Sequence, residues 1–236
     1  MFSSIRSATL LGIQGTPISV EVHIGSGLPG FTVVGLPDEA CREARDRVRA
    51  ALLSSGAEWP NKKITVNLAP SSQRKGGVGL DLALAMGILS ASGQMSSDNL
   101  AEYSFVAELG LDGSLRPVPG AAPLVAGLRE TRVVVALPNA REAKVASPRS
   151  IHCAATLRDV VLALRGDGEW LDTSTQEKIH ASSHIADMSD VRGQPTARLA
   201  AEIAAAGSHH ILFVGSPGAG KTMIAERLPG LLPPLT

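Results

Sequence analysis

The chain has 236 residues, of which 44% are hydrophobic and only 3% aromatic, and its 22 Lys and Arg balance its 22 Asp and Glu. This composition argues against nucleic-acid binding through a global positive charge or through aromatic stacking, so any such contact has to come from a local patch. Cys41 and Cys153 match no metal-ligand spacing and suit reduced thiols. Because we find neither a secretory leader nor an apolar run near the ~20 residues of a membrane span, we expect a cytoplasmic protein with no membrane contact.

The first 56 residues predict strands followed by a helix. The runs "ATLLGI", "PISVEVHI" and "GFTVVG" are rich in β-formers and separated by Gly and Pro turns, as in an antiparallel or mixed sheet. Asp38 is placed to cap a helix that ends at Gly56. One apolar stripe of this helix should face the core, formed by Ala40, Ala44, Val48, Ala51 and Leu52.

The opposite face of this helix is strongly charged. It is able to contact phosphate, but Glu43 and Arg47 at i,i+4 and Asp46 and Arg49 at i,i+3 are equally able to pair with each other. We favour the second interpretation, a self-paired face in solvent.

The next hundred residues predict a mixture of strands and helices. "KKITVNLAP" reads as a strand, and the glycine-rich loop "SSQRKGGVG" leads into "LDLALAMGILSAS", a helix so apolar all round that it should be buried. Strands are expected in "YSFVAEL" and "RVVVALP", and helices at about 121–130, 139–146 and 156–165. This order indicates an α/β (α+β) domain over residues 1–165. Arg74 and Lys75 could meet DNA or a neighbouring subunit, but a solvated loop is the favoured interpretation.

Residues 166–186 are polar, lack periodicity and suit an interdomain linker. A second domain then covers residues 187–236. It should contain the helix "PTARLAAEIAAAG" closed by Gly207, the strand "HHILFVG" and the helix "KTMIAERL". His209 and His210 would point to opposite faces of that strand and so could not jointly bind one metal ion.

The second domain carries a complete phosphate-binding loop pattern, between a predicted strand and a predicted helix. Its residues are Gly215, Ser216, Pro217, Gly218, Ala219, Gly220, Lys221 and Thr222. The glycines allow backbone N–H groups to turn toward phosphate oxygens. Lys221 would reach the β- and γ-phosphates and the Thr222 hydroxyl would bind Mg²⁺, which predicts ATP and Mg²⁺ as cofactors.

Hydrolysis in this class also needs an acidic residue on a later strand and an arginine directed at the γ-phosphate. Only fourteen residues follow Thr222, and they include the Pro-broken tail "LPGLLPPLT". We therefore expect the chain as given to be a truncated portion that binds nucleotide weakly and does not hydrolyse it.

Four segments together resemble the ComM/YifB group of magnesium-chelatase-like AAA+ ATPases: "GLPDEACREARDRVRAALLSSG", "PNKKITVNLAP", "DVRGQPTARLAAEIAAAG" and "GSPGAGKTMIAERLPGLLPPL". The resemblance covers essentially the whole chain. It implies a Lon-protease-like domain of the ribosomal-S5 type at residues 1–165 and the start of an AAA+ module at 187–236. It also implies an adenine pocket that involves Asp190, Val191, Arg192 and Gly193, up to Gln194.

At the level of the whole protein, the resemblance implies a ring, most simply a homo-hexamer, that moves along DNA. Such a motor would promote branch migration in recombination and natural transformation. Two alternatives remain open, a magnesium-chelatase-type motor subunit and a passive S5-type module that binds RNA or protein. A Lon-like front domain argues against the first, and intact Lys221 and Thr222 argue against the second.

The resemblance to Lon does not extend to its catalytic dyad. Aligning the two Lon motifs places Gly79 at the nucleophilic serine and Ala122 at the lysine base, and neither residue can perform these steps. Ser71 and Ser72 lie nearby, but they follow Pro70 in a turn, where hydroxyls commonly cap backbone groups. We expect no protease activity.

Overall fold

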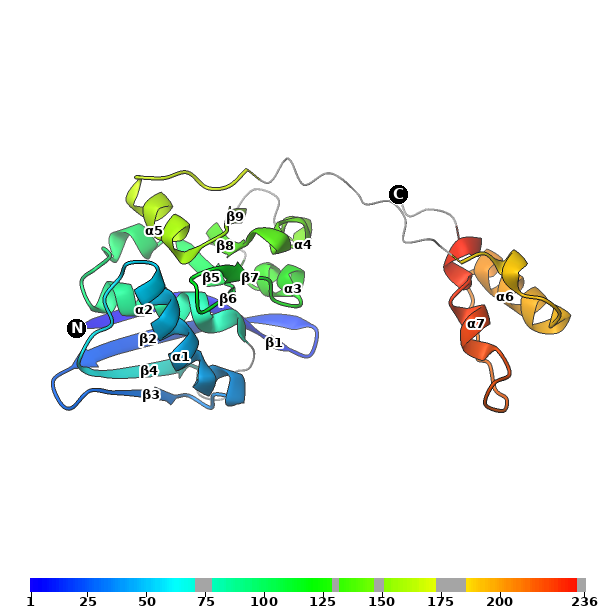
Figure 1. Cartoon of the computed structure of the whole chain (residues 1–236), viewed down its shortest axis with the longest axis horizontal. Coiled ribbons are helices and arrows are strands. Elements are labelled where there is room, and N and C mark those ends of the chain that lie inside the picture. Colours follow the sequence, from blue (N-terminus) through cyan, green and yellow to red (C-terminus); the bar gives the residue numbers. More distant parts are fainter. Residues whose placement is uncertain (71–77, 129–131, 147–150, 173–185, 233–236) are drawn as a thin grey trace. The chain divides into compact units, whose positions relative to one another are not determined.

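A computed structural model describes residues 1–70, 78–128, 132–146, 151–172 and 186–232. The chain divides into two compact units, residues 1–177 (unit 1) and 178–236 (unit 2), and each is described by itself (Figure 1). The elements of unit 1 are β1 (Phe2–Leu11), β2 (Gln14–Gly25), β3 (Gly30–Val34), α1 (Glu39–Ser54), β4 (Lys63–Ala69), η1 (Val78–Leu80), α2 (Asp81–Ala91), η2 (Asp98–Leu100), β5 (Tyr103–Val106), β6 (Glu108–Leu109), β7 (Leu115–Arg116), α3 (Ala121–Ala126), β8 (Arg132–Ala136), η3 (Leu137–Asn139), α4 (Ala140–Ala146), β9 (Ile151–Ala154) and α5 (Leu157–Arg165). Those of unit 2 are η5 (Met188–Asp190), α6 (Pro195–Gly207), α7 (Lys221–Ala225) and η6 (Leu228–Leu231).

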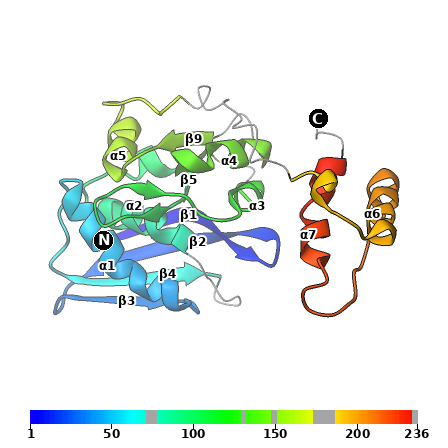
Figure 2. The ribbon, with the colours of Figure 1, turned by 45° about the vertical axis from the view of Figure 1, so that its right-hand side comes forward.

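Unit 1 is built on a seven-stranded mixed sheet in the order β3-β4-β2-β1-β5-β8-β9. The β1–β2 and β2–β4 pairs are antiparallel, and the other four pairs are parallel. Figures 1 and 2 show β3, β4, β2 and β1 side by side at one end of the sheet. The predicted α/β class is confirmed. The S5-type and Lon-like assignment and the domain boundaries at 165 and 187 stay predictions.

The sheet separates two hydrophobic cores, and strand β8 shows why. Successive side chains of a strand point to opposite faces. Val134 packs into the core that contains α2 and α5, whereas Val133 and Val135 pack into a second core with α3 and α4. A central parallel strand with both faces covered therefore reads as an unbroken apolar run, as "RVVVALP" does.

Helix α2 confirms the prediction of a buried helix, because every residue from Asp81 to Leu89 is buried. It packs against β1 and β2. Gly87 allows the close approach: a Cβ at this position would lie 2.6 Å from Cγ2 of Val22.

Helix α1 begins where the sequence predicts. The Asp38 side chain accepts a hydrogen bond from the Cys41 N–H at 2.9 Å, and Gly56 after the helix takes a φ of 81°. Of the predicted stripe, the described side chains are buried, namely Ala44, Val48, Ala51 and Leu52.

The prediction for the charged face of α1 is only partly right. Arg47 does approach Glu43 at 3.7 Å, but its stronger partner is the buried Asp81 of α2, at 2.7 Å. Asp46 pairs with Arg45, not with Arg49, whose guanidinium lies 6.0 Å from the ring centroid of Trp59. The expected Glu43–Arg47 pair is therefore present beside a closer contact with Asp81, whereas the expected Asp46–Arg49 pair does not form.

Several other boundaries differ from the predictions. "YSFVAEL" forms two strands: β5 joins the large sheet, and β6 pairs with β7 in a separate two-stranded sheet. Strands β7 and β9 were not predicted. Residues 71–77, which include Ser71, Ser72, Arg74 and Lys75, lie outside the described residues, so the predictions made for them stay open.

Unit 1 does not end with its last helix. The Leu171 N–H donates to the Cys153 carbonyl of β9 at 3.0 Å. The Trp170 ring lies 4.9 Å from the ring centroid of His152 and 5.8 Å from that of Tyr103. Part of the predicted linker is therefore attached to the sheet.

Unit 2 packs η5, α6 and α7 around four buried residues, Met188, Val191, Ala201 and Ile224. The predicted strand "HHILFVG" is wrong, because residues 209–214 form no strand. A strand needs a hydrogen-bonding partner, and the described part of unit 2 contains no other strand. Accordingly, Leu212 and Val214 are 84% and 86% exposed. Gly207 is the last helical residue, and Ser208 takes the left-handed conformation in its place, with a φ of 53°.

None of the helices in the described part of the chain is long and apolar enough to cross a bilayer. Cys41 and Cys153 are both buried, and neither forms a disulfide.

Candidate nucleotide-binding site

The predicted phosphate-binding loop connects residues 209–214 with helix α7. Gly218 and Gly220 have φ values of 81° and 78°, a region that other residues enter only with strain. A Cβ at Gly220 would also lie 2.8 Å from Nε2 of Gln194, but this is the end of a flexible, exposed side chain, so the positive φ is the stronger reason for a glycine here. Most of the loop is exposed, namely Gly215, Ser216, Pro217, Gly218, Ala219 and Thr222, while Gly220 and Lys221 are half-buried.

Lys221 folds back over the loop that precedes it. Its Nζ donates to the carbonyl oxygens of Gly215 at 3.0 Å and of Ser216 at 2.8 Å. An ammonium group has three donors and no acceptor. A phosphate oxygen that enters the loop can therefore take over bonds that Lys221 now makes to neutral carbonyls, and bonds to charged acceptors are stronger.

Further donors of the loop are available. The N–H groups of Gly218 and Gly220 have no acceptor among the residues that the structure describes, whereas the Ala219 N–H donates to the Ser216 carbonyl at 3.3 Å. The Thr222 side chain at the start of α7 is exposed. Free N–H groups, an ammonium and a hydroxyl at one loop form a suitable environment for a phosphate group with its Mg²⁺.

The structure brings the segment 190–194 beside this loop. Gln194 Nε2 donates to the Ala219 carbonyl at 3.1 Å. Val191 is buried and its carbonyl accepts from Arg198 at 3.3 Å. Arg192 and Gly193 are exposed. A role of this segment in an adenine pocket stays a prediction.

Arg227 is a part of this region that sequence reasoning missed. Its Nη1 donates to the Met223 carbonyl at 2.8 Å and its Nη2 lies 3.3 Å from Oδ2 of Asp190. Its Nε is buried without a partner among the described residues. The sequence did place a cation just after the short helix α7, where the helix dipole favours positive charge, and this could have pointed to Arg227.

Gly79 and Ala122, the two positions that the predicted Lon alignment places at the catalytic dyad, carry neither a nucleophile nor a base. A Cβ on Gly79 would contact Val118 and Val106 at 3.6 and 3.8 Å, so its surroundings are apolar. The Ala122 N–H donates to Glu142. His209 and His210 are both exposed, and in the described ranges no group of three or more His, Cys, Asp or Glu is placed to hold a metal ion.

Comparison with known proteins agrees with these observations. Residues 20–140 match the family model described as subunit ChlI of Mg-chelatase, and residues 187–236 match that of magnesium chelatase, subunit ChlI. Over 239 residues the chain is 43% identical to competence protein ComM of Haemophilus influenzae, covering 98% of this chain and 47% of that protein.

Two further relatives have a similar sequence identity to this chain. The protein YifB of Salmonella typhimurium is 44% identical over 234 residues, covering 98% of this chain and 46% of YifB. The protein YifB of Escherichia coli is 43% identical over 237 residues, covering 99% of this chain and 46% of that protein. The chain belongs to the ComM/YifB family of magnesium-chelatase-like proteins. It spans about half the length of the ComM and YifB relatives it matches.

Proposed function

We propose that this ComM/YifB family member binds ATP with Mg²⁺ through Gly215–Thr222, as part of an AAA+ ATPase. The observation that carries the proposal is the loop itself. Gly218 and Gly220 hold it in a left-handed conformation, and Lys221 lies across it on carbonyls that phosphate oxygens can replace. Mg²⁺ would supply the positive charge that screens the phosphates, with the Thr222 hydroxyl as its protein ligand.

The segment Asp190–Gln194 would support the bound nucleotide. Gln194 donates to the Ala219 carbonyl and Arg227 donates to Asp190, so hydrogen bonds join the segment to the loop and to the residues after α7. A nucleotide base beside this segment would place its phosphates at the loop.

Titration of the 236-residue chain with MgATP tests this proposal. We expect weak binding that shifts the backbone NMR resonances of residues 215–222, and Lys221→Ala should weaken it about 10- to 100-fold, the effect of one charge-assisted hydrogen bond. Lys144→Ala in unit 1 is the control. Binding that survives Lys221→Ala, or shifts confined to unit 1, would refute the assignment.

For the whole protein, we propose a cytoplasmic homo-hexameric motor that uses ATP to move along DNA and promotes branch migration. The name of one relative, competence protein ComM, supports a role in natural transformation. A full-length member of the family should hydrolyse ATP faster with branched DNA. The same change at the lysine that corresponds to Lys221 should abolish this stimulation.

A magnesium-chelatase-type motor subunit is the second candidate. It is favoured by the descriptions of both matching family models, one of which covers residues 20–140 of the front domain. The presence of that domain is therefore a weaker argument against a chelatase role than the sequence suggests. Stimulation of hydrolysis by a porphyrin-chelatase partner and not by DNA would select this candidate.

A further inference from the structure

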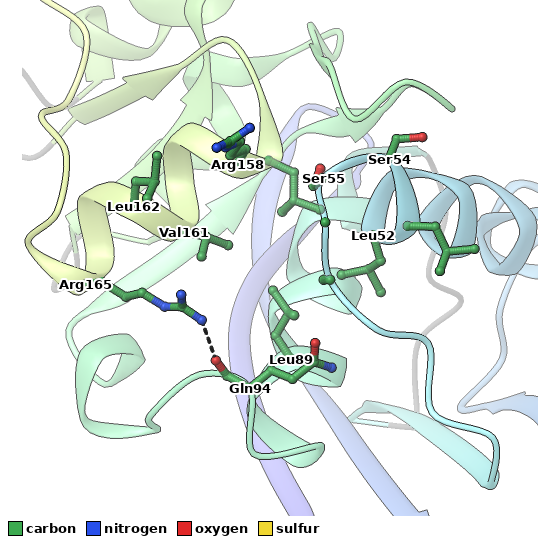
Figure 3. Close-up of a pocket in the computed structure, with 13 residues that line it drawn as sticks. Leu52, Ser54, Ser55, Leu89, Gln94, Arg158, Val161, Leu162 and Arg165 are labelled. Atoms are coloured by element: carbon green, nitrogen blue, oxygen red, sulfur yellow. Dashed lines mark hydrogen bonds between the residues drawn. The ribbon is translucent and has the colours of Figure 1, made fainter.

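A groove lies on unit 1 between the C-terminal end of α1 and helix α5, with a volume of about 580 Å³. Helix α5 contributes Arg158, Val161, Leu162 and Arg165 to it. These positions are spaced i, i+3, i+4 and i+7, which is one face of a helix. Figure 3 shows the two arginines at opposite ends of α5, with Val161 directed toward Leu52.

The groove is partly open to solvent, and apolar side chains form a strip along it, while Ser54, Ser55 and Gln94 add polar groups to its lining. Leu53 at the end of α1 is 52% exposed although it lines the groove. Val161, Leu162 and Ala57 are half-buried, and Leu52 and Leu89 are buried beneath them. An apolar strip of this kind between two cations offers a surface for leucine-type side chains.

The charges along the groove have one sign. Arg158 has no hydrogen-bond or ion-pair partner among the described residues, and Arg165 donates a single bond, from Nη2 to the Gln94 carbonyl at 2.7 Å. No Asp or Glu lines the groove. The nearby carboxylate of Asp159 is used in the capping box of α5 with Thr156.

We propose that this groove binds an acidic amphipathic α-helix of a partner protein. Seven residues of helix rise about 10 Å, so Arg158 and Arg165 match carboxylates placed about one heptad apart on an incoming helix. Apolar residues between those carboxylates would cover Leu53, Val161 and Leu162. The apolar strip makes a nucleic acid a poor occupant, because most contacts to nucleic acid go to phosphate and sugar.

Selection from a phage-displayed library of helical peptides, with the intact 236-residue chain immobilised, tests the proposal. The enriched peptides should combine leucine-type residues with glutamates about one heptad apart. The best peptide is then synthesised with a fluorescent label and titrated. Arg158→Glu with Arg165→Glu should weaken its binding at least tenfold, and Leu53→Ser several-fold.

Arg141→Glu, at an exposed arginine of α4 outside the groove, is the matched control and should leave binding unchanged. Leu53→Ser provides an independent test should the double charge reversal unfold. The proposal is overturned by a library that yields no binder, by enrichment of basic peptides, or by acidic peptides that bind the variants and the parent equally. Oligonucleotide binding that depends on Arg158 and Arg165 would instead make the groove a nucleic-acid site. The groove lies in unit 1 and does not depend on the proposed nucleotide site.

Discussion

Replacing Arg47 with methionine should destabilise unit 1 far more than an ordinary change on a helix surface. Arg47 Nε and Nη2 donate to the two carboxylate oxygens of Asp81 at 2.7 and 3.1 Å. The Asp81 side chain is 1% exposed and that of Arg47 is 19% exposed. Because Arg47→Met leaves a buried carboxylate without its counter-charge, the free energy of unfolding should fall by about 3–5 kcal/mol.

The loss should depend on pH in a defined direction. Burial raises the pKa of the Asp81 carboxyl, while the hydrogen bonds and charge of Arg47 lower it and the charge of Glu108 adds to the rise. Without Arg47 the pKa rises further above that of the unfolded chain. Between these two pKa values the folded state keeps a proton that the unfolded state has lost, so stability falls as pH rises, by up to about 1.4 kcal/mol per pH unit.

Urea unfolding followed by tryptophan fluorescence measures this effect. Both tryptophans of the chain, Trp59 and Trp170, lie in unit 1, so the signal reports this unit alone. Arg45→Met is the control, because Arg45 and Asp46 form an exposed pair that should contribute less than about 1 kcal/mol. Adding Asp81→Leu to Arg47→Met should restore part of the stability. Equal losses for Arg47→Met and Arg45→Met, or stability of Arg47→Met that increases with pH, would refute the reasoning.

Three further predictions concern the core, the thiols and the phosphate loop. Gly87→Ala should destabilise unit 1 by about 1–3 kcal/mol in the same urea assay, because the added methyl group would meet Val22 within the closely packed core. Burial raises the pKa of the Cys41 thiol to about 12 and that of Cys153 to about 11. A disulfide reagent at about pH 8 should therefore modify both only after unfolding, and rapid labelling of the folded chain would contradict their burial. Lys221→Ala should leave the tryptophan unfolding curve unchanged, and a shifted curve would show that the loop stabilises unit 1.

Local signals in the sequence predicted a large part of unit 1. The N-cap at Asp38, the stop at Gly56 and the apolar helix α2 each depend on neighbouring residues alone, and each is confirmed. The partner of Arg47 could not be predicted in this way, because Asp81 lies 34 positions away and reads as an unremarkable first residue of a helix. The local pattern offered Glu43 instead, and the closer and more buried carboxylate is the stronger partner.

In unit 2 the local pattern of residues 209–214 favours a strand, yet no strand forms. The β-branched residues of this segment favour a strand when another strand lies beside them. Whether such a neighbouring strand is present cannot be read from the local sequence. Of the three glycines singled out in this loop, Gly218 and Gly220 take left-handed φ values and Gly215 does not, and the binding of phosphate by the loop stays a prediction. The groove beside α5 had no sequence signal at all, because its two sides come from positions about a hundred residues apart.

Trp170 and Leu171 contact β9, so the packed part of unit 1 extends beyond its last helix. A shortened protein that stops at Arg165 would keep all the helices and strands that the structure describes in this unit. It would nevertheless lose the ring that packs on His152 and Tyr103. A transferred unit keeps these contacts only if the chain extends at least to Leu171. The segment that carries the contacts of unit 1 is therefore longer than the segment that carries its helices and strands.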